Sequence, residues 1–563
     1  MRKIFSLVFL CLGVSLHSQN AIFIPDTLTG SNITLTVKKD SVQFLSGPVT
    51  QTYGINNYKY FGPTLILNKG QHVSITVNNS MGDTTTMHWH GLHVAAINDG
   101  GPHSMIMDGM SWNPQFVVMN NASTCWYHPH LDRKTGLQAL RGAAGVIIVR
   151  DPVEAALDLP RTYGVDDFPI VVQSHEFDSV NQINPRAMSD SILLVNGTQN
   201  PMVNLPAQVV RLRLLNASQE RTFLFGLTNN KSFSVIGNDG GLLSAPVATT
   251  RISVSPGERA EILVDLGGMT GQATYLISYG SELPSDVRGG PPMNMGGTNT
   301  MYSPFDGINF NILKLNVVAP TANPVTSIPA SLVTVPRLLA ANANTTRSIT
   351  FTAQNMMVMD GPFYFNDSLF NMNRIDYRIP LNNTEIWSLN DQTMVAHPFH
   401  IHGMQFQILD RDGNPPAAKE AGWKDVVLVH HQETVRIITK FTDFPDANTP
   451  YMYHCHILMH EDDGMMGQYV IVDSALSVQE VAGDKNFSIY PNPFTGKFFV
   501  ESSAHENINR IDLFDAIGQK VLSKTIANET LNIEIETGEL AKGIYVIQLS
   551  TNSGTRSYKL IRE

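Results

Sequence analysis

The sequence contains one short pattern three times: a run that alternates apolar and polar residues, followed by two identical ring side chains two positions apart and a glycine. The first copy reads HVSITVNN and leads to HWHG (88–91), the second reads VVRLRLLNAS and leads to FLFG (223–226), and the third reads TEIWSLND and leads to HIHG (400–403). Alternating runs of this length are typical of β-strands. The repeat predicts three homologous β domains, of which the second holds Phe where the others hold His.

The spacing of the copies and the turn-rich breaks between them define the predicted domains. A chain of 563 residues has room for three or four domains of about 150 residues each. We predict an all-β chain built from two-sheet antiparallel sandwiches. The predicted segments are a signal peptide at 1–19, sandwich domains at 20–155, 160–320 and 335–475, and a small C-terminal β-sandwich domain at 484–563.

The chain begins MRKIFSLVFLCLGVSLHSQN, which combines a basic start, an apolar run and a small-residue exit. This pattern is typical of a secretory signal peptide, and the run is too short to span a bilayer. We therefore expect export, with no transmembrane segment once the signal is removed. The formal net charge of −11, without any Lys/Arg run, argues against nucleic acid as a partner.

Histidines gather in four short clusters. Ten of the 18 histidines lie in them: His88 and His90; His128 and His130; His397, His400 and His402; His454, His456 and His460. Side chains two apart on a strand point to the same face, so each His-x-His pair presents both imidazoles together. Four pairs supply eight imidazoles, which suits a cluster of three copper ions shared between the first and third domains.

The remaining donors predict a second site. Cys455 lies between the two histidines of the last pair and must face away from both, and His397 has the opposite parity to the pair that follows it. With His460 they form a His2Cys set, which is typical of a blue (type 1) copper site completed by a weak axial methionine. Met465, five residues after His460, is placed to supply that methionine.

The motifs HWHG, WYHPH, HPFHIH and HCHILMHEDDGM, in this order, resemble the four copper motifs of the three-domain multicopper oxidases. The resemblance covers about residues 50–475, and GWKDVVLV and HEDDGMMG are most similar to the branch holding bacterial copper-efflux oxidases, spore-coat laccases and bilirubin oxidases. It implies three cupredoxin-like Greek-key sandwiches and four copper ions: one of type 1, one of type 2 and a type 3 pair. The family takes single electrons from a small reductant and reduces dioxygen to water.

The resemblance also implies roles for individual residues. It assigns His88 and His400 to the type 2 copper. It assigns Asp99 and Glu461 to proton delivery, because the closest branch has carboxylates at the matching positions and dioxygen reduction consumes protons. It assigns to the type 3 pair the residues His90, His128, His130, His402, His454 and His456.

The C-terminal segment carries different phrases: YPNP near its start, LAKGIYVI and a final KLI. They resemble the C-terminal sorting domain of proteins exported by the bacterial type IX secretion system. This implies the secretion machinery as a partner and a secreted or cell-surface location. An accessory β domain for adhesion is the alternative interpretation.

Three functions remain open at this level. The leading prediction is an exported oxidase of phenols, tetrapyrroles or similar small reductants. The second is a cuprous oxidase in copper detoxification, with methionine clusters as candidate ligands, although core filling also explains them. The clusters contain Met293, Met295, Met301, Met356, Met357 and Met359. The third is a non-enzymatic copper-binding or electron-transfer protein, which needs only the blue site.

Overall fold

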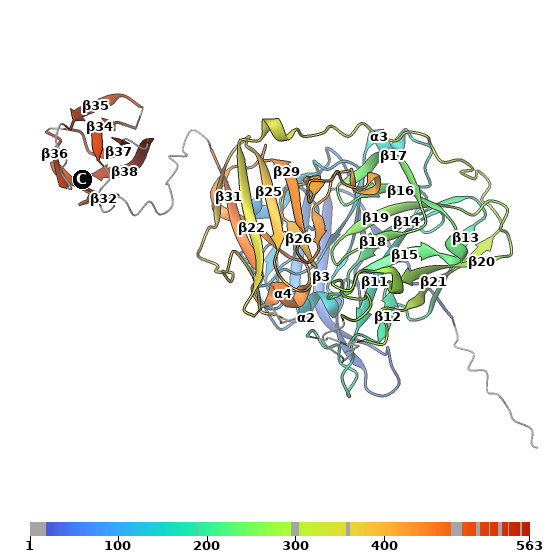
Figure 1. Cartoon of the computed structure of the whole chain (residues 1–563). Helices are drawn as coiled ribbons and strands as arrows, with labels where there is room; N and C mark the ends of the chain where they lie inside the picture. Colours follow the sequence, from blue (N-terminus) through green and yellow to red (C-terminus); the bar gives the residue numbers. More distant parts are fainter. Residues whose placement is uncertain are drawn as a thin grey trace, which may run out of the picture. The chain divides into compact units, whose positions relative to one another are not determined.

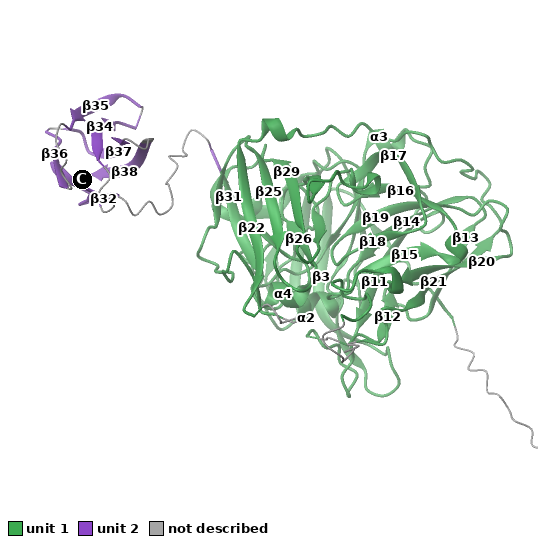
Figure 2. Ribbon diagram, viewed as in Figure 1, with its two compact units in different colours: residues 1–471 green, residues 472–563 purple. Residues whose placement is uncertain are grey.

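The computed structural model describes residues 19–186, 189–293, 303–355, 361–473, 487–502, 507–516, 518–526, 532–538, 540–551 and 554–563. The chain forms two compact units, residues 1–471 and residues 472–563 (Figures 1 and 2). The predicted signal peptide, apart from its last residue, lies outside the described residues, and so do the clustered methionines other than Met293.

Unit 1 contains three sandwiches in chain order (Figure 1). In the first, one sheet has the order β4-β3-β6-β7, with β8 paired to β6, and the other has the order β2-β5-β10-β9. The bounds are β2 Thr27–Leu28, β3 Asn32–Val42, β4 Thr50–Ile55, β5 Thr64–Asn68, β6 His72–Ser80, β7 Ser111–Trp112, β8 Gln115–Val117, β9 Ser123–Tyr127 and β10 Gly145–Arg150.

The second sandwich has two six-stranded sheets, β12-β11-β14-β19-β16-β17 and β1-β13-β21-β20-β15-β18. Its first strand, β1, comes from the start of the chain and pairs in parallel with β13. The bounds are β1 Asn20–Ala21, β11 Asp167–His175, β12 Ile192–Val195, β13 Pro201–Pro206, β14 Val209–Asn216, β15 Phe223–Leu227, β16 Phe233–Asn238, β17 Gly241–Thr249, β18 Ile252–Val254, β19 Arg259–Asp265, β20 Ala273–Tyr279 and β21 Asn309–Val318.

The third sandwich has two five-stranded sheets, β23-β22-β25-β29-β27 and β24-β31-β30-β26-β28. The second of these sheets carries the histidine-rich strands β26 and β30. The bounds are β22 Thr345–Ala353, β23 Phe363–Phe365, β24 Tyr377–Pro380, β25 Thr384–Asp391, β26 His397–Ile401, β27 Gln407–Arg411, β28 Val426–Val429, β29 Thr434–Lys440, β30 Asp446–Cys455 and β31 Met466–Val472.

The three alternating runs of the repeat form the equivalent strands β6, β14 and β25. Each pairs in parallel with the long strand that precedes it in its sandwich, namely β3, β11 and β22. The all-β prediction is confirmed. In the second sandwich, Phe223 and Phe225 of β15 are fully buried in the apolar core with ring centroids 5.5 Å apart, so that domain fills with hydrocarbon the space that its neighbours line with imidazoles.

Short helices lie between strands in unit 1 and position parts of the site. They are α1 Ala96–Asp99, α2 Thr135–Leu140, α3 Pro152–Ala155 and α4 Leu458–Asp462, with 3-10 turns at Thr228–Asn230, Gly280–Glu282, Ala340–Asn342 and Ala418–Glu420. The start of α2 is tied to α4, because the carboxylate of Asp462 accepts hydrogen bonds from the amides of Thr135 and Gly136 at 2.9 and 3.0 Å. This contact joins the first and third sandwiches next to the last histidine cluster.

Unit 2 contains a three-stranded sheet, β32-β33-β36, and a four-stranded sheet, β35-β34-β37-β38. Among the residues that the structure describes, its apolar core is formed by side chains between Phe487 and Leu560. The bounds are β32 Phe487–Tyr490, β33 Lys497–Ser502, β34 Ile508–Phe514, β35 Lys520–Thr525, β36 Asn532–Glu536, β37 Gly543–Thr551 and β38 Gly554–Arg562. A core of its own makes unit 2 a separate folding module.

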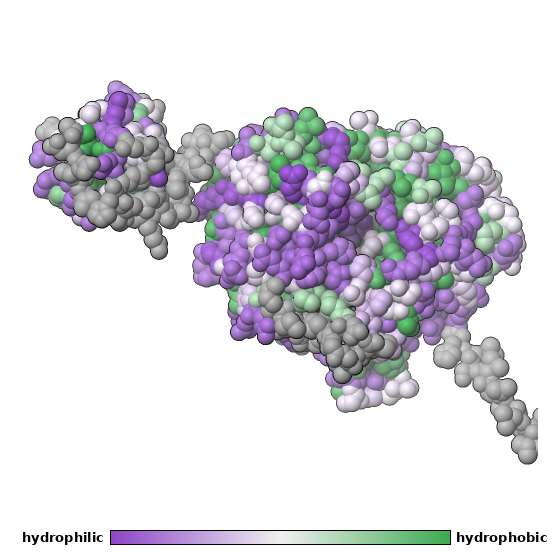
Figure 3. Space-filling view, viewed as in Figure 1, coloured by the Kyte–Doolittle hydropathy of each residue, from purple (hydrophilic) through white to green (hydrophobic). Residues whose placement is uncertain are grey.

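The visible face of unit 1 carries broad hydrophilic areas beside smaller hydrophobic ones (Figure 3). Among the described residues, no helix combines the length and the apolar character that crossing a membrane requires.

Candidate metal centre

Eight imidazoles from the first and third sandwiches meet in one buried cluster. In the first sandwich, His88 and His128 exchange backbone hydrogen bonds of 2.8 and 3.1 Å, which brings the two His-x-His pairs side by side. In the third sandwich, His400 on β26 is directly opposite His454 on β30. The four pairs thus face one another across the domain boundary, and each of the eight side chains is at most 1% exposed.

Several ring nitrogens of the cluster lie close enough to one another to bind the same metal ion. Nε2 of His454 lies 3.1 Å from Nε2 of His130 and 3.2 Å from Nε2 of His402, and Nε2 of His456 lies 3.3 Å from Nδ1 of His90. Two stacked ring pairs with centroids 3.8 Å apart, His88 on His402 and His90 on His400, join the two sandwiches.

Hydrogen bonds turn four of the eight rings so that Nε2 points into the cluster. The bonds run from Nδ1 of His88, His128, His400 and His454 to the carbonyl oxygens of Asp99, Pro129, Asp425 and Cys455, at 3.0, 2.8, 2.8 and 2.9 Å. A hydrogen bond at one nitrogen leaves the lone pair of the other for a metal. Among the described residues, Nε2 of His88, His128 and His400 is buried without a hydrogen-bond partner. Buried unpaired acceptors of this kind fit a metal site.

Burial also affects the protonation of six of the cluster imidazoles. Removal from water disfavours the charged imidazolium and holds the pKa of these side chains well below the ordinary value; this applies to His90, His128, His130, His400, His402 and His456. These imidazoles are therefore neutral, which is the form that binds a metal.

A second set of donors lies on the opposite side of β30. Sγ of Cys455 is 3.5 Å from Nδ1 of His397 and 3.6 Å from Nδ1 of His460, and the two nitrogens are 3.3 Å apart. Three ligands about 2.0–2.3 Å from one metal ion would span such a triangle. Met465 is buried in the same apolar core as Cys455, and its backbone amide donates to the carbonyl of His460 at 2.9 Å.

The chemistry of this set favours a soft metal ion. Burial lowers the pKa of His397 to about 3 and raises the pKa of the Cys455 thiol well above its ordinary value. A buried thiol gives up its proton when a cation takes the proton's place. Phe363 covers the set, with its ring centroid 4.7 Å from that of His397 and 4.4 Å from that of His460. A thiolate with two imidazoles suits copper.

Asp99 and Glu461 both lie against cluster histidines. Oδ2 of Asp99, at the end of α1, is 2.8 Å from Nδ1 of His402. On α4, Oε2 of Glu461 is 3.2 Å from Nδ1 of His454 and Oε1 is 3.5 Å from Nδ1 of His130. Both carboxylates are nearly fully buried. Among the described residues, Oδ1 of Asp99 and both oxygens of Glu461 have no hydrogen-bond partner.

The sequence reasoning missed a third carboxylate at the cluster. Oδ1 of Asp425 lies 3.2 Å from Nε2 of His90, and the side chain of Arg259 binds both oxygens of Asp425 at 2.5 and 2.6 Å. Asp425 stands directly before the apolar run VVLV of β28. An acid next to a fully buried strand rarely lies in the interior without a charged or polar partner. Its position in the sequence therefore indicated a paired, buried carboxylate.

Three β sandwiches, a cluster of eight buried imidazoles and a separate His2Cys set define a cupredoxin-type metalloprotein. Models of the multicopper oxidase family match residues 336–475, 36–154 and 167–297. The chain therefore belongs to the multicopper oxidase family, a family of copper-binding oxidoreductases. Residues 488–563 match a secretion system C-terminal sorting domain. Both resemblances found in the sequence are confirmed.

Relatives cover most of unit 1. The multicopper oxidase mco of Staphylococcus haemolyticus is 31% identical over 477 residues, which are 82% of this chain and 94% of the relative. The cell division protein FtsP of Sodalis glossinidius is 32% identical over 447 residues, 78% of this chain and 89% of the relative. The solved structure of the laccase-like multicopper oxidase CueO from Ochrobactrum sp. has a TM-score of 0.70 at 33% identity, covering 80% of this chain and all of that chain.

Proposed function

We propose that this protein is an exported multicopper oxidase that takes electrons one at a time from phenolic, tetrapyrrole or similar small reductants and reduces dioxygen to water. The observation that carries the proposal is that ligands of both candidate metal sites are adjacent residues at the end of β30. Cys455 belongs to the His2Cys set, while its covalent neighbours, His454 and His456, belong to the eight-imidazole cluster. Electrons accepted at one set thus have a short through-bond path to the other.

We propose four copper ions. His397, Cys455, His460 and Met465 would hold the type 1 copper, and His88 and His400 would hold the type 2 copper. Within the described part of the chain, Nε2 of His88 and Nε2 of His400 are buried without a hydrogen-bond partner, so both are free to bind a metal ion. The type 3 pair would be held by His90, His128, His130, His402, His454 and His456.

When bound, copper supplies the one-electron redox chemistry that couples oxidation of the donor to four-electron reduction of dioxygen. The chain's own residues orient the imidazoles through their outer nitrogens and exclude bulk water from the cluster. Asp99 and Glu461 are the proposed proton-holding groups, since dioxygen reduction needs protons inside a buried site. Their unpaired oxygens, Oδ1 of Asp99 and Oε1 and Oε2 of Glu461, are where those protons would reside.

Electrons enter at the His2Cys set. Nε2 of His397 is held by the hydroxyl of Thr393 at 2.9 Å, whereas Nε2 of His460 has no hydrogen-bond partner among the described residues. We therefore propose that the donor docks over His460, beside the ring of Phe363. The Ochrobactrum enzyme is described as having oxidase activity towards lignin model compounds and lignosulfonate, which supports an aromatic donor.

Purified protein loaded with copper is expected to be blue, to contain four copper ions per chain and to consume oxygen with a phenol or bilirubin before any cupric ion is added. The measurement is oxygen uptake with each organic donor and with cuprous ion, before and after adding cupric ion. An enzyme that is inert with organic donors until copper is supplied, yet fast with cuprous ion, would overturn this substrate assignment in favour of copper detoxification.

A non-enzymatic copper-binding or electron-transfer protein is the alternative from another class, and the similarity to a relative named cell division protein FtsP keeps it under test. Such a protein needs one redox site and no dioxygen site. The eight paired imidazoles argue against it. Blue protein that holds a single copper ion and takes up no oxygen with any donor would favour this alternative.

Deleting residues 484–563 is expected to leave a blue, active oxidase and to stop its appearance outside the cell. The reason is that the apolar core of unit 2, as far as the described residues show, is formed by side chains between Phe487 and Leu560, while the donor residues lie in unit 1. The measurement compares copper content and oxygen uptake of the purified truncated and full chains, together with their distribution between cells and medium. Loss of copper from the truncated protein in vitro would show that the tail is structural.

A further inference from the structure

His90 is oriented differently from its neighbours in the cluster. In His88, His128, His400 and His454 the outer hydrogen bond is made by Nδ1. In His90 the outer contact is made by Nε2, which lies 3.2 Å from Oδ1 of Asp425, and Nδ1 faces Nε2 of His456. A neutral imidazole carries its proton on the nitrogen that donates, so Asp425 leaves the lone pair of Nδ1 pointing inward.

Asp425 is held in place by the second sandwich. Its two oxygens accept hydrogen bonds from the two terminal nitrogens of Arg259. This bidentate geometry fixes the orientation of the carboxylate as well as its distance. Arg259 is itself immobilised: Nε donates to the carbonyl of Thr124 at 2.9 Å, and its amide donates to Asp239 at 2.7 Å. The side chains of Arg259, Asp425 and Asp239 are buried.

The segment just before Arg259 also contacts a second histidine of the cluster. Residues 255–258 form a turn in which the carboxylate of Glu258 accepts from both the amide and the hydroxyl of Ser255 at 2.7 Å. Gly257 in this turn has φ +82, and a Cβ there would lie 2.6 Å from Cδ2 of His456. Only glycine combines that backbone conformation with that close approach. The backbone of the second sandwich is thus in direct contact with the ring of His456.

We infer that the turn at 255–259 of the second sandwich is a positioning element for the copper ion that His90 and His456 share. Arg259, acting through Asp425, selects Nδ1 of His90 as the metal-facing nitrogen, and Gly257 sets the place of the His456 ring. This inference rests on the proposed function, because it requires copper in the cluster. The domain that holds Phe223 and Phe225 in place of a His-x-His pair thus serves the site through this turn.

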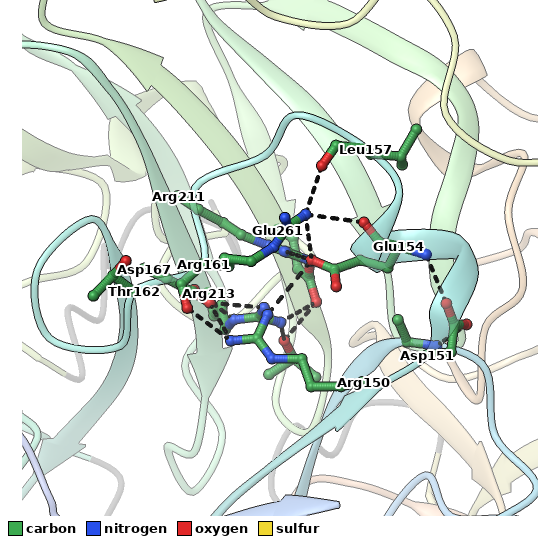
Figure 4. A network of polar contacts seen from close by, with 12 residues as sticks. Arg150, Asp151, Glu154, Leu157, Arg161, Thr162, Asp167, Arg211, Arg213 and Glu261 are labelled. Carbon is green, nitrogen blue, oxygen red and sulfur yellow. Dashed lines mark hydrogen bonds and ion pairs between the residues drawn. The ribbon is translucent and has the colours of Figure 1, made fainter. Parts of the chain in front are cut away.

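A neighbouring ion network supplies a matched control (Figure 4). Glu261 follows Arg259 by two residues on β19 and pairs with Arg211 and Arg213. The carboxylate of Asp167 accepts hydrogen bonds from Nε and Nη2 of Arg213 at 2.6 and 3.0 Å. Like Asp425, it is buried. No contact joins Asp167 to a cluster histidine within the described part of the chain. Asp167→Asn therefore breaks a comparable buried pair away from the copper site.

The first test compares Asp425→Asn with Asp167→Asn in the full-length chain. Asp425→Asn is expected to weaken copper binding by the cluster about 10–100-fold, the usual effect of losing a partner that orients a ligand, and to diminish the near-ultraviolet absorption of the coupled copper pair while the blue colour stays. Asp167→Asn is expected to lower the unfolding temperature and keep both copper signals. Measurements are chelator competition, absorption and electron paramagnetic resonance spectra, and thermal unfolding.

The second test covers the case in which Asp425→Asn fails to fold. Gly257→Ala is compared with Gly268→Ala, where φ is +74 and a Cβ would have no atom within 4 Å. Both glycines have a positive φ, so both variants strain the backbone, and only Gly257→Ala presses on His456. Gly257→Ala is expected to lose the coupled-pair absorption and Gly268→Ala to retain it.

Two outcomes overturn the inference. One is wild-type copper affinity and coupled-pair absorption in Asp425→Asn and Gly257→Ala. The other is equal loss in Asp167→Asn and Gly268→Ala, which would mean that any destabilisation of the second sandwich disturbs the cluster. The proposed function fails separately, when the wild-type chain itself binds no copper in the cluster and shows no coupled-pair absorption.

Discussion

Cys455→Ser is expected to abolish both the blue colour and the oxidation of every donor, while the protein keeps up to three copper ions. The thiolate is the soft donor of the His2Cys set, and a serine hydroxyl of similar size is a hard, weak ligand for copper. The substitution also removes the sulfur from which electrons would pass through the backbone to His454 and His456. Copper analysis, visible absorption and oxygen uptake measure the three effects.

The matched control is Cys125→Ser. Cys125 is also a buried free cysteine, and its Sγ contacts the hydroxyl of Ser123 at 3.5 Å. This variant is expected to stay blue and active. A fully active Cys455→Ser enzyme would refute the assignment of the type 1 site.

The acid substitutions Asp99→Asn and Glu461→Gln are expected to slow the reoxidation of the reduced enzyme by dioxygen about 10–100-fold while copper stays bound. Both carboxylates are buried beside cluster imidazoles, and the amides that replace them keep the shape but cannot hold or release the proton. Rapid mixing separates the two half-reactions: bleaching of the blue colour by a donor without oxygen, and its return when oxygen is added. The first is expected to change less than the second.

Asp462→Asn is the control for Glu461→Gln, because it alters the next residue of α4. The carboxylate of Asp462 binds the amides of Thr135 and Gly136, and burial raises its pKa to about 8. We expect this variant to lower stability and to leave the ratio of the two half-reactions as in the wild type. Equal slowing of both half-reactions in the Asp99 and Glu461 variants would count against a proton role.

The sequence by itself determined the features that depend on neighbours within a few residues. Strand alternation predicted β6, β14 and β25, because the period of side chains along a strand is a local property. The same parity placed Cys455 on the opposite side of its strand from His454 and His456. Motif order and spacing were enough to identify the family, since four separate motifs agree.

Only the tertiary structure decided which groups orient the imidazoles. His90 and Asp425 are 335 residues apart, and Arg259 reaches Asp425 from another sandwich; nothing local in the sequence relates these residues. The stacking of His88 on His402 and the cover of Phe363 over His397 likewise arise between distant segments. The nitrogen that a histidine offers to a metal is set by the partner of its other nitrogen, and that partner exists only once the sandwiches have packed together.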